Sequence, residues 1–342
     1  MTMLCKLKEG QKIWPPPIWL MRQAGRYLSE YNGVRNKAGS FLELCYNPEL
    51  ASEVTLQPIK RFDFDAAIIF ADILLIVENL GFDLDFIDQE GPVISGSGDA
   101  YNSSVDTKIS VGSSRLMKVG EAINLTRNKL DKTKSLIGFC GAPWTVLTYI
   151  INGRSTKDFQ ETLAWAINNH ALTNEIIENI TDLSIDYLSM QIEAGADVVK
   201  IFDSWAGVLP NELFLEWVIK PTCKIISEIK LKHPSCPVIG FPRGAGELYL
   251  EYVDKTGVDI IALDSNLSRV FCRDKLQEKV ILQGNVCPDL LRKGGKVLQN
   301  DIQENLQMFG GKPFIFNLGH GIKKDTPIEN IHDLIRIVRD YK

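Results

Sequence analysis

The chain has 342 residues, of which 45% are hydrophobic and 24% charged, and its formal net charge is -5. This composition is that of an ordinary globular protein and excludes a disordered or fibrous chain. The acidic balance also excludes broad electrostatic attraction to nucleic acid or to an anionic membrane, so any anionic ligand is expected to meet a local group of basic residues.

The first marked segment is PPPIWLMRQAGRYLSEY, residues 15–31, which places Arg22 and Arg26 four residues apart behind a proline run. Two arginines at this spacing can share one face of a helix and then repel each other slightly, but Gly25 weakens a helix there. One interpretation is a solvated helix edge. The other is a cluster, extended by Arg35, that recognises carboxylates or phosphates through planar guanidinium groups.

Short apolar runs then recur along the chain, and each ends in Gly, Pro or a polar residue. They cover residues 65–72, 135–141, 197–204, 237–242, 259–264, 280–285 and 314–320. Near-continuous Val, Ile, Leu and Phe without polar alternation predict parallel strands that are buried on both faces.

Helical patterns lie between these runs, and residues 173–195 form one that ends at Gly195. For the last helix the sequence predicts Thr326 as N-cap, Pro327 as first helical residue and Glu329 as the partner in a capping box.

The alternation of strands and helices, with no long linker, predicts one distorted (β/α)8 barrel domain over residues 1–342 with loop insertions. The runs supply only seven of its eight strands, and a doubly wound open sheet is the alternative. The Gly- and Ser-rich residues 91–114 are expected to form a loop or small hairpin that covers a cleft.

In a parallel barrel, the side chains that do chemistry lie at the carboxyl ends of the strands. These ends carry a polar rim made of Asp72, Asp203, Ser204, Arg243, Asp264, Asn285 and His320. Asp264 is typical of a helix cap and Asn285 of a turn. Asp72 lies within an apolar run, which indicates a carboxylate placed to meet a cationic group.

Several common fingerprints are absent from the sequence. It has no Gly-rich dinucleotide motif after a strand, no phosphate-binding P-loop, no His-Glu-x-x-His and no nucleophile elbow. Nicotinamide-dependent, nucleotide-hydrolysing and zinc-protease functions therefore lose their main support.

The seven cysteines are widely spaced and include no Cys-x-x-Cys pair, which is typical of a reduced intracellular protein without a zinc site. The first residues are interrupted by charges and do not resemble a signal peptide, and the longest apolar passage is too short to span a bilayer. We therefore expect a cytoplasmic protein with no membrane segment and no bound metal.

Two longer motifs carry a resemblance to a known family. PIWLMRQAGRY, residues 17–27, and GFCGAPWTVLTYIINGR, residues 138–154, closely resemble the two signatures of the uroporphyrinogen decarboxylase family, and shorter matches follow in the family's order at residues 66–74, 201–207, 282–285 and 317–321. One departure is Trp205, which follows Ser204 where many relatives have another residue.

The resemblance implies a cofactor-independent enzyme that decarboxylates the four acetate side chains of uroporphyrinogen III to give coproporphyrinogen III, usually as a homodimer. It implies that Asp72 accepts hydrogen bonds from the pyrrole NH groups, and that Arg22 binds substrate and donates a proton. The remaining substrate-binding residues that the resemblance implies are Arg26, Arg35, Tyr149, Ser204 and His320.

Two other functions stay open at this point. Cobamide-dependent methyltransferases belong to the same superfamily and activate a thiol through zinc, but Cys140 and Cys272 have no histidine nearby in the sequence. A noncatalytic tetrapyrrole carrier would keep the arginines but would not need Asp72.

Overall fold

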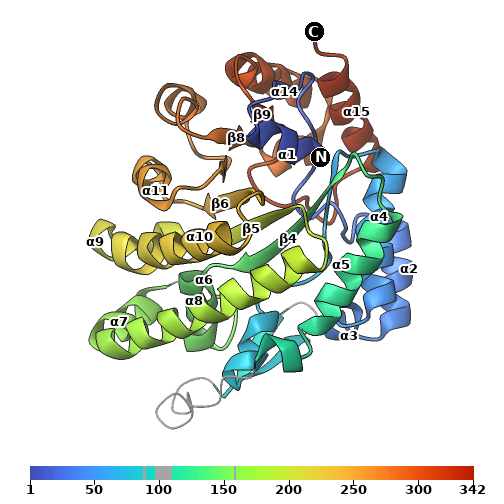
Figure 1. Ribbon diagram of the computed structural model, residues 1–342. Coiled ribbons are helices and arrows are strands. Elements are labelled where there is room, and N and C mark those ends of the chain that lie inside the picture. The colour runs from blue at the N-terminus through green and yellow to red at the C-terminus, as the bar shows by residue number, and fades with distance from the viewer. Residues whose placement is uncertain (88–89, 97–109, 158) are drawn as a thin grey trace.

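Seven parallel strands form the central sheet of the computed structural model, which describes residues 1–87, 90–96, 110–157 and 159–342 (Figure 1). In spatial order they are β1 (Ala66–Ile68), β4 (Ser135–Gly141), β5 (Val198–Asp203), β6 (Val238–Pro242), β7 (Ile260–Ala262), β8 (Ile281–Gln283) and β9 (Phe314–Ile315). All neighbouring pairs are parallel. The strand predicted from each of the seven apolar runs is therefore confirmed.

The eighth position of the barrel is taken by the segment around Ile18. The amide of Phe316, just beyond β9, donates to the carbonyl of Pro17 at 2.9 Å, and the amide of Asp65, just before β1, donates to the carbonyl of Ile18 at 2.8 Å. These bonds join the two edges of the sheet, so the fold is a TIM-barrel-like ring and the open-sheet alternative is wrong.

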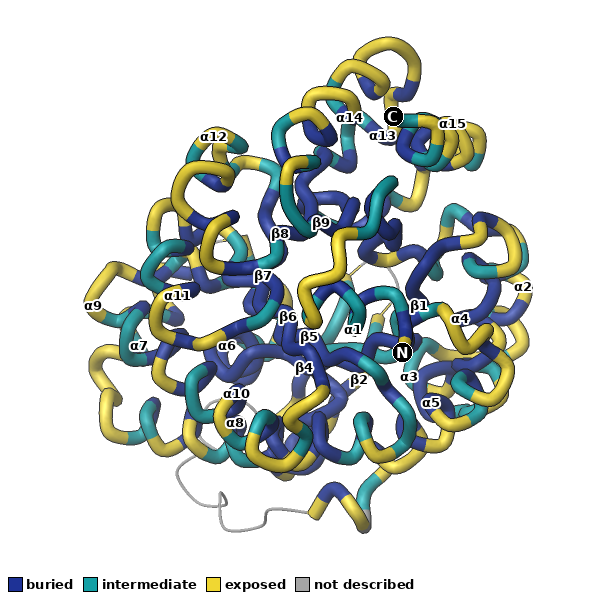
Figure 2. Tube along the Cα trace, turned by 45° about the horizontal axis from the view of Figure 1, so that its top comes forward, coloured by how far each residue is buried: buried dark blue, intermediate teal, exposed yellow. Residues whose placement is uncertain are grey.

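Helices alternate with the strands; most of them cover the outside of the ring and the first closes one end, so that dark, buried strands lie in the middle of Figure 2 with partly exposed helices around them. They are α1 (Met3–Lys8), α2 (Ser29–Ala38), α3 (Phe41–Cys45), α4 (Pro48–Phe62), α5 (Met117–Lys129), α6 (Pro143–Asn152), α7 (Gln160–Asn168), α8 (His170–Glu193), α9 (Asn211–Phe214), α10 (Lys220–Lys232), α11 (Leu248–Thr256), α12 (Arg269–Phe271), α13 (Pro288–Lys293), α14 (Gly295–Phe309) and α15 (Ile328–Arg339). The helix predicted for residues 173–195 is confirmed as α8. No helix in the described part of the chain is long and apolar enough to cross a membrane.

The predicted capping box of the last helix is wrong. Helix α15 begins at Ile328, and Pro327 is its N-cap, with extended backbone angles. Thr326 therefore lies one residue before the cap, and its buried hydroxyl has no hydrogen-bond partner among the described residues.

A small hairpin follows β1, as the sequence predicts, although it begins earlier than expected. Strands β2 (Asp83–Ile87) and β3 (Gly91–Ser95) pair antiparallel, and the amide of Ile94 donates to the carbonyl of Gly153 at 2.7 Å. This bond ties the hairpin to the end of α6. Of the rest of the expected insertion, residues 97–109 lie outside the described residues.

The two ends of the barrel differ. Helix α1 closes the end at which the strands begin, because Leu4 and Leu7 are almost fully buried against interior residues such as Ile137. The amide of Leu4 also donates to the hydroxyl of Ser135, the first residue of β4, at 3.0 Å. The carboxyl ends of the strands are thus the end that remains available for a site.

Candidate active site

Asp72 lies just beyond β1, at the carboxyl end of the barrel, and its side chain is half-buried. One carboxylate oxygen accepts a hydrogen bond from the amide of Leu74 at 2.9 Å, which fixes its orientation as in an Asx turn. Burial raises the pKa of Asp72 to about 6, although the Leu74 amide and the nearby Arg22 guanidinium oppose the rise. Arg22 is thus the cation whose charge acts on this carboxylate.

Arg22 is an exposed residue in a turn, so the arginine pair does not lie on a helix. Its φ of 61° places a non-glycine residue in the left-handed region, a strained conformation that is often found at functional sites. The aliphatic part of Arg22 lies against Gly321, where an added Cβ would come within 2.3 Å of Arg22 Cδ. Because Gly321 has no side chain, the Arg22 side chain can pass over it toward the site.

Tyr149 lies on α6 and comes close to both Asp72 and Arg22. Burial raises the pKa of Tyr149, hydrogen bonding to Trp205 and Ser155 opposes that rise, and the Asp72 charge adds to it. The phenol is therefore protonated at neutral pH and can donate a hydrogen bond.

His320 follows the last strand, and its neighbour Gly319 allows close packing there, since a Cβ at Gly319 would come within 2.3 Å of the Ser265 amide nitrogen. Burial, followed by the positive charges of Arg22 and Arg243, lowers the pKa of His320 to about 3. Its Nδ1 atom is buried without a partner among the described residues. The imidazole is therefore neutral at physiological pH.

Ser204 follows β5, and the loop that carries it is fixed by its neighbour Asp203. The hydroxyl of Thr145 donates to an Asp203 carboxylate oxygen at 2.5 Å, and the amide of Trp205 donates to the Thr145 hydroxyl at 3.1 Å. Burial raises the pKa of Asp203 to about 7. We infer that Asp203 has a positioning role beneath the loop.

Arg26 and Arg35 form a second pair of cations, whose charges both act on Tyr31. Both charges oppose the burial that raises the pKa of the Tyr31 hydroxyl. The Arg35 guanidinium also lies 5.9 Å from the centre of the Phe41 ring. Arg35 and Asp72 both act on the buried thiol of Cys45. Burial and the Asp72 charge raise the pKa of this thiol, whereas the Arg35 charge opposes the rise. Electrostatic interactions thus link Arg22 with Asp72, Tyr149 and His320, and Arg26 and Arg35 both act on Tyr31.

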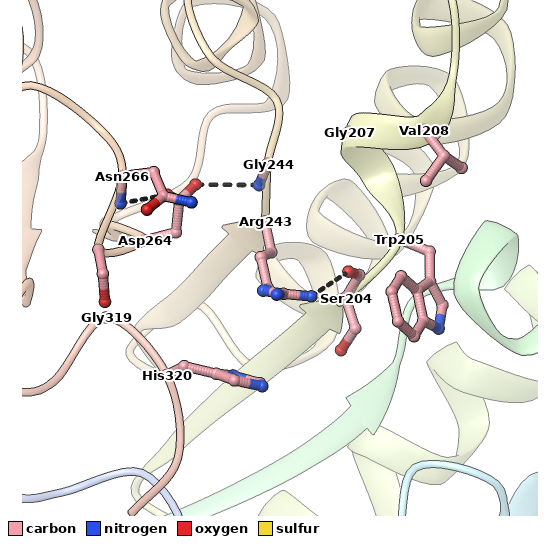
Figure 3. A pocket seen from close by; sticks show the side chains of 11 residues that line it. Ser204, Trp205, Gly207, Val208, Arg243, Gly244, Asp264, Asn266, Gly319 and His320 are labelled. Carbon is pink, nitrogen blue, oxygen red and sulfur yellow. Dashed lines mark hydrogen bonds between the residues drawn. The ribbon is translucent and has the colours of Figure 1, made fainter. Parts of the chain in front are cut away.

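A pocket of about 240 Å³ opens beside His320 (Figure 3). Its lining residues include Ser204, Trp205, Arg243 and Asn266. The sequence analysis placed Arg243 on the polar rim but did not assign it to the site, because one arginine after a strand carries no pattern. Its position at the end of β6 was the available signal.

Two other rim residues make structural hydrogen bonds, but the prediction that Asp264 caps the following helix is wrong, because the N-cap of α12 is Ser268. Asp264 accepts hydrogen bonds from the amides of Gly244 and Asn266, each at 2.9 Å. Asn285 donates to the carbonyls of Asp264 and Leu267. Both residues shape loops.

Lys200 is a feature that the sequence analysis did not single out. It points into the barrel from β5, is fully buried, and places its amine 4.5 to 5.0 Å from the centres of the rings of Trp19, Phe202 and Phe241. Burial lowers the pKa of this amine well below its usual value, and Nζ has no hydrogen-bond partner in the described residues.

No group of three or more His, Cys, Asp or Glu residues in the described segments could hold a metal ion. The seven cysteines are free thiols, and four of them, including Cys140 and Cys272, are buried.

Comparison with known proteins gives a consistent family assignment. The family model described as Uroporphyrinogen decarboxylase (URO-D) matches residues 2–341. A protein named uroporphyrinogen decarboxylase from Chelativorans sp. (strain BNC1) is 46% identical over 337 residues, which are 98% of each chain. A protein of the same name from Orientia tsutsugamushi (strain Ikeda) is 48% identical and covers 95% of this chain and 94% of its own.

Among solved structures, a methyltransferase from Methanosarcina mazei superposes with a TM-score of 0.78 over 98% of this chain and 97% of its own. The sequence identity is 20%, so this likeness shows a shared fold alone.

Proposed function

The chain belongs to the uroporphyrinogen decarboxylase family, so its reaction is a decarboxylation in porphyrin and haem biosynthesis, and we propose that Asp72 and Arg22 act in the chemical step. The substrate is uroporphyrinogen III, whose four acetate side chains become the methyl groups of coproporphyrinogen III. The chemistry below uses only the substrate's own rings and side chains of this chain.

Loss of carbon dioxide from an acetate leaves an electron pair that needs an acceptor. A pyrrole ring becomes this acceptor when a proton adds to the ring carbon next to the acetate-bearing carbon. The bond to the carboxylate then breaks, its electron pair enters the ring, and carbon dioxide leaves. The remaining methylene takes up a proton to become a methyl group while the ring carbon loses the first one, so each cycle consumes one proton.

In this scheme Asp72 accepts hydrogen bonds from the pyrrole NH groups in its ionised form and stabilises the positive charge of the protonated ring. A preorganised charge aimed at a developing opposite charge is often the largest single contribution to catalysis. The observation that carries the proposal is this half-buried carboxylate, whose ionised form is stabilised, among the described residues, by one backbone amide and the nearby Arg22.

The basic residues around Asp72 serve the substrate's carboxylates. Arg22 binds one of them and is the proposed proton donor, while Arg26 and Arg35 bind others from the second pair of cations. Tyr149, Ser204 and the neutral His320 form hydrogen bonds with the substrate, and these hydrogen bonds fix the position of the macrocycle. A ligand with eight carboxylates calls for such a local group of donors in a chain whose net charge is -5.

The test is anaerobic incubation of the protein with uroporphyrinogen III, followed by separation of the porphyrins after oxidation. We expect products with seven, six, five and four carboxylates to accumulate. Tight binding with unchanged ligand would instead indicate a carrier, and no interaction would reject the substrate.

We also propose that residues 1–342 form one barrel domain that works in the cytoplasm as a homodimer. The match to the family over residues 2–341 and the family resemblance support this. Sedimentation of the purified protein at several concentrations tests the dimer: a single species of monomer mass at micromolar concentration would reject it.

A further inference from the structure

Arg243 lies at a central position in the pocket beside His320. It follows β6, while Ser204 and Trp205 follow β5 and His320 follows β9. Figure 3 shows its side chain reaching from the end of β6 toward Ser204, with His320 on the neighbouring side. The aliphatic part of Arg22 lies against Gly321, the neighbour of His320, and the charges of Arg22 and Arg243 both lower the pKa of the imidazole, so the pocket adjoins the surroundings of Arg22.

The guanidinium of Arg243 has no acidic partner among the described residues. Within the described part of the chain its one hydrogen bond is from Nη1 to the carbonyl of Ser204, at 3.3 Å, and its Cζ atom lies 5.7 Å from the centre of the Trp205 ring. The nearest acid on the pocket wall, Asp264, is occupied by the amides of Gly244 and Asn266. Most of the five N–H donors of this arginine are therefore available to a ligand.

The surroundings hold this cation in place. Trp205 packs tightly on Phe159, with ring centres 4.6 Å apart, and its backbone carbonyl accepts a hydrogen bond from the Trp144 indole at 3.1 Å. A half-buried guanidinium held over a fixed indole loses little conformational freedom when it binds a carboxylate. The buried hydroxyl of Ser265, which has no hydrogen-bond partner in the described segments, and the exposed amide side chain of Asn266 are further polar groups on the pocket wall.

The reaction indicates which of the substrate's carboxylates would bind to Arg243. A cation bound tightly to the reacting acetate would stabilise the charge that must disappear as carbon dioxide forms, and would raise the barrier. A strong cationic subsite therefore suits a carboxylate that the reaction leaves intact. Propionates meet this condition, and they are one carbon longer than acetates, so they reach farther from the macrocycle.

We propose that Arg243, held by Trp205 and the Ser204 carbonyl, binds a propionate side chain of the substrate in this pocket. The proposal deepens the function given above and depends on it. It adds a specificity residue that recognises the part of the ligand shared by uroporphyrinogen III and coproporphyrinogen III.

The experiment compares Arg243→Met with wild type in anaerobic initial-rate assays. We expect KM for uroporphyrinogen III to rise about tenfold or more, since hydrogen bonds to charged groups are among the stronger ones, while kcat falls far less. We expect the inhibition constant of added coproporphyrinogen III to rise by a similar factor. Arg243→Lys should restore part of both, and thermal unfolding verifies that each variant is folded.

The control is Arg336→Met, an exposed arginine on α15 that pairs with Asp333, which should leave KM and product inhibition unchanged. A raised KM with unchanged product inhibition would overturn the propionate assignment, because it would place Arg243 on an acetate. An unchanged KM would overturn the subsite itself. In either case, product formation by wild type would leave the proposed function standing.

Discussion

Asp72, which we propose acts in the chemical step, lies in an environment where burial disfavours its ionised form. Its pKa of about 6, raised by burial, lies above the value near 3.9 of an unfolded chain. The folded state therefore binds this proton more tightly, and the stability that Asp72 contributes at low pH is lost as the pH rises through about 6. The free enzyme is destabilised by the form of Asp72 that the reaction needs.

We predict that kcat/KM of wild type falls as the pH drops below about 6, because the carboxylate becomes protonated. Asp72→Asn should lower kcat by at least about 100-fold and remove this limb of the profile. Urea unfolding at pH 7.5 should show the variant to be about 1 to 2 kcal/mol more stable than wild type, with the difference vanishing near pH 4.

Asp83→Asn, on an exposed residue of the β2 hairpin, is the matched control and should change neither activity nor stability. Normal turnover in Asp72→Asn would remove Asp72 from the mechanism. A variant that is less stable at pH 7.5 would contradict the electrostatic account of the site.

Lys200 provides a second prediction at this scale. Burial lowers the pKa of its amine, whereas an unfolded lysine has a pKa near 10.4, so the unfolded state binds more protons between these values and stability rises with pH there. Lys200→Met should raise the free energy of unfolding at pH 7 by on the order of 2 kcal/mol.

The gain from Lys200→Met should shrink as the pH rises toward about 10.4, because only the unfolded wild type still binds the proton in this range and the wild type is therefore stabilised by each further rise in pH. Urea titrations at pH 7 and 9.5 measure this, and Lys132→Met, on an exposed loop residue, should show no such dependence. A destabilised Lys200→Met at pH 7 would mean that the amine makes a favourable interaction in the barrel.

At the scale of elements, closure of the barrel depends on a short segment and on one buried acid. Asp65 accepts hydrogen bonds from the amide of Ile18 at 2.7 Å and from Arg339 of α15 at 2.6 Å. Its side chain is only 7% exposed, whereas Asp63, two residues earlier, pairs with Lys134 and is 89% exposed. The same substitution at the two positions therefore separates closure of the barrel from surface charge.

We predict that Asp65→Asn lowers the free energy of unfolding by about 1 to 3 kcal/mol, because it weakens a charge-assisted, largely buried hydrogen bond. Asp63→Asn should change it by less than about 0.5 kcal/mol. Urea unfolding followed by tryptophan fluorescence measures both, and equal effects would show that Asp65 has no special part in closing the barrel.

The same element shows what the sequence could and could not predict. Seven strands were readable because each is a continuous apolar run. The closing segment around Ile18 was not, since it is only a few residues long, follows a proline run and is defined by partners at Asp65 and Phe316. The candidate site shows the same contrast. A long motif contains Arg22 and a shorter match contains Asp72, whereas the place of Arg243 in the pocket depends on how β5, β6 and β9 come together.

At the scale of the whole molecule, the barrel separates stability from chemistry. The site lies at the carboxyl ends of the strands, and α1 fills the opposite end with Leu4 and Leu7. This division is general for parallel barrels, and here it allows the two properties to be tested independently.

Leu4 is fully buried between α1 and the interior of the barrel, whereas Leu231 on α10 is 77% exposed. Leu4→Ala should lower the free energy of unfolding by about 2 to 4 kcal/mol through lost burial and the cavity left behind, and Leu231→Ala should have almost no effect.

Both variants should keep wild-type KM and kcat at temperatures where they remain folded, because α1 lies at the end of the barrel away from Asp72. Urea unfolding and the anaerobic assay measure the two properties on the same samples. A folded Leu4→Ala protein with reduced kcat would show that the packing of α1 reaches the site through the barrel interior, and the separation would then fail.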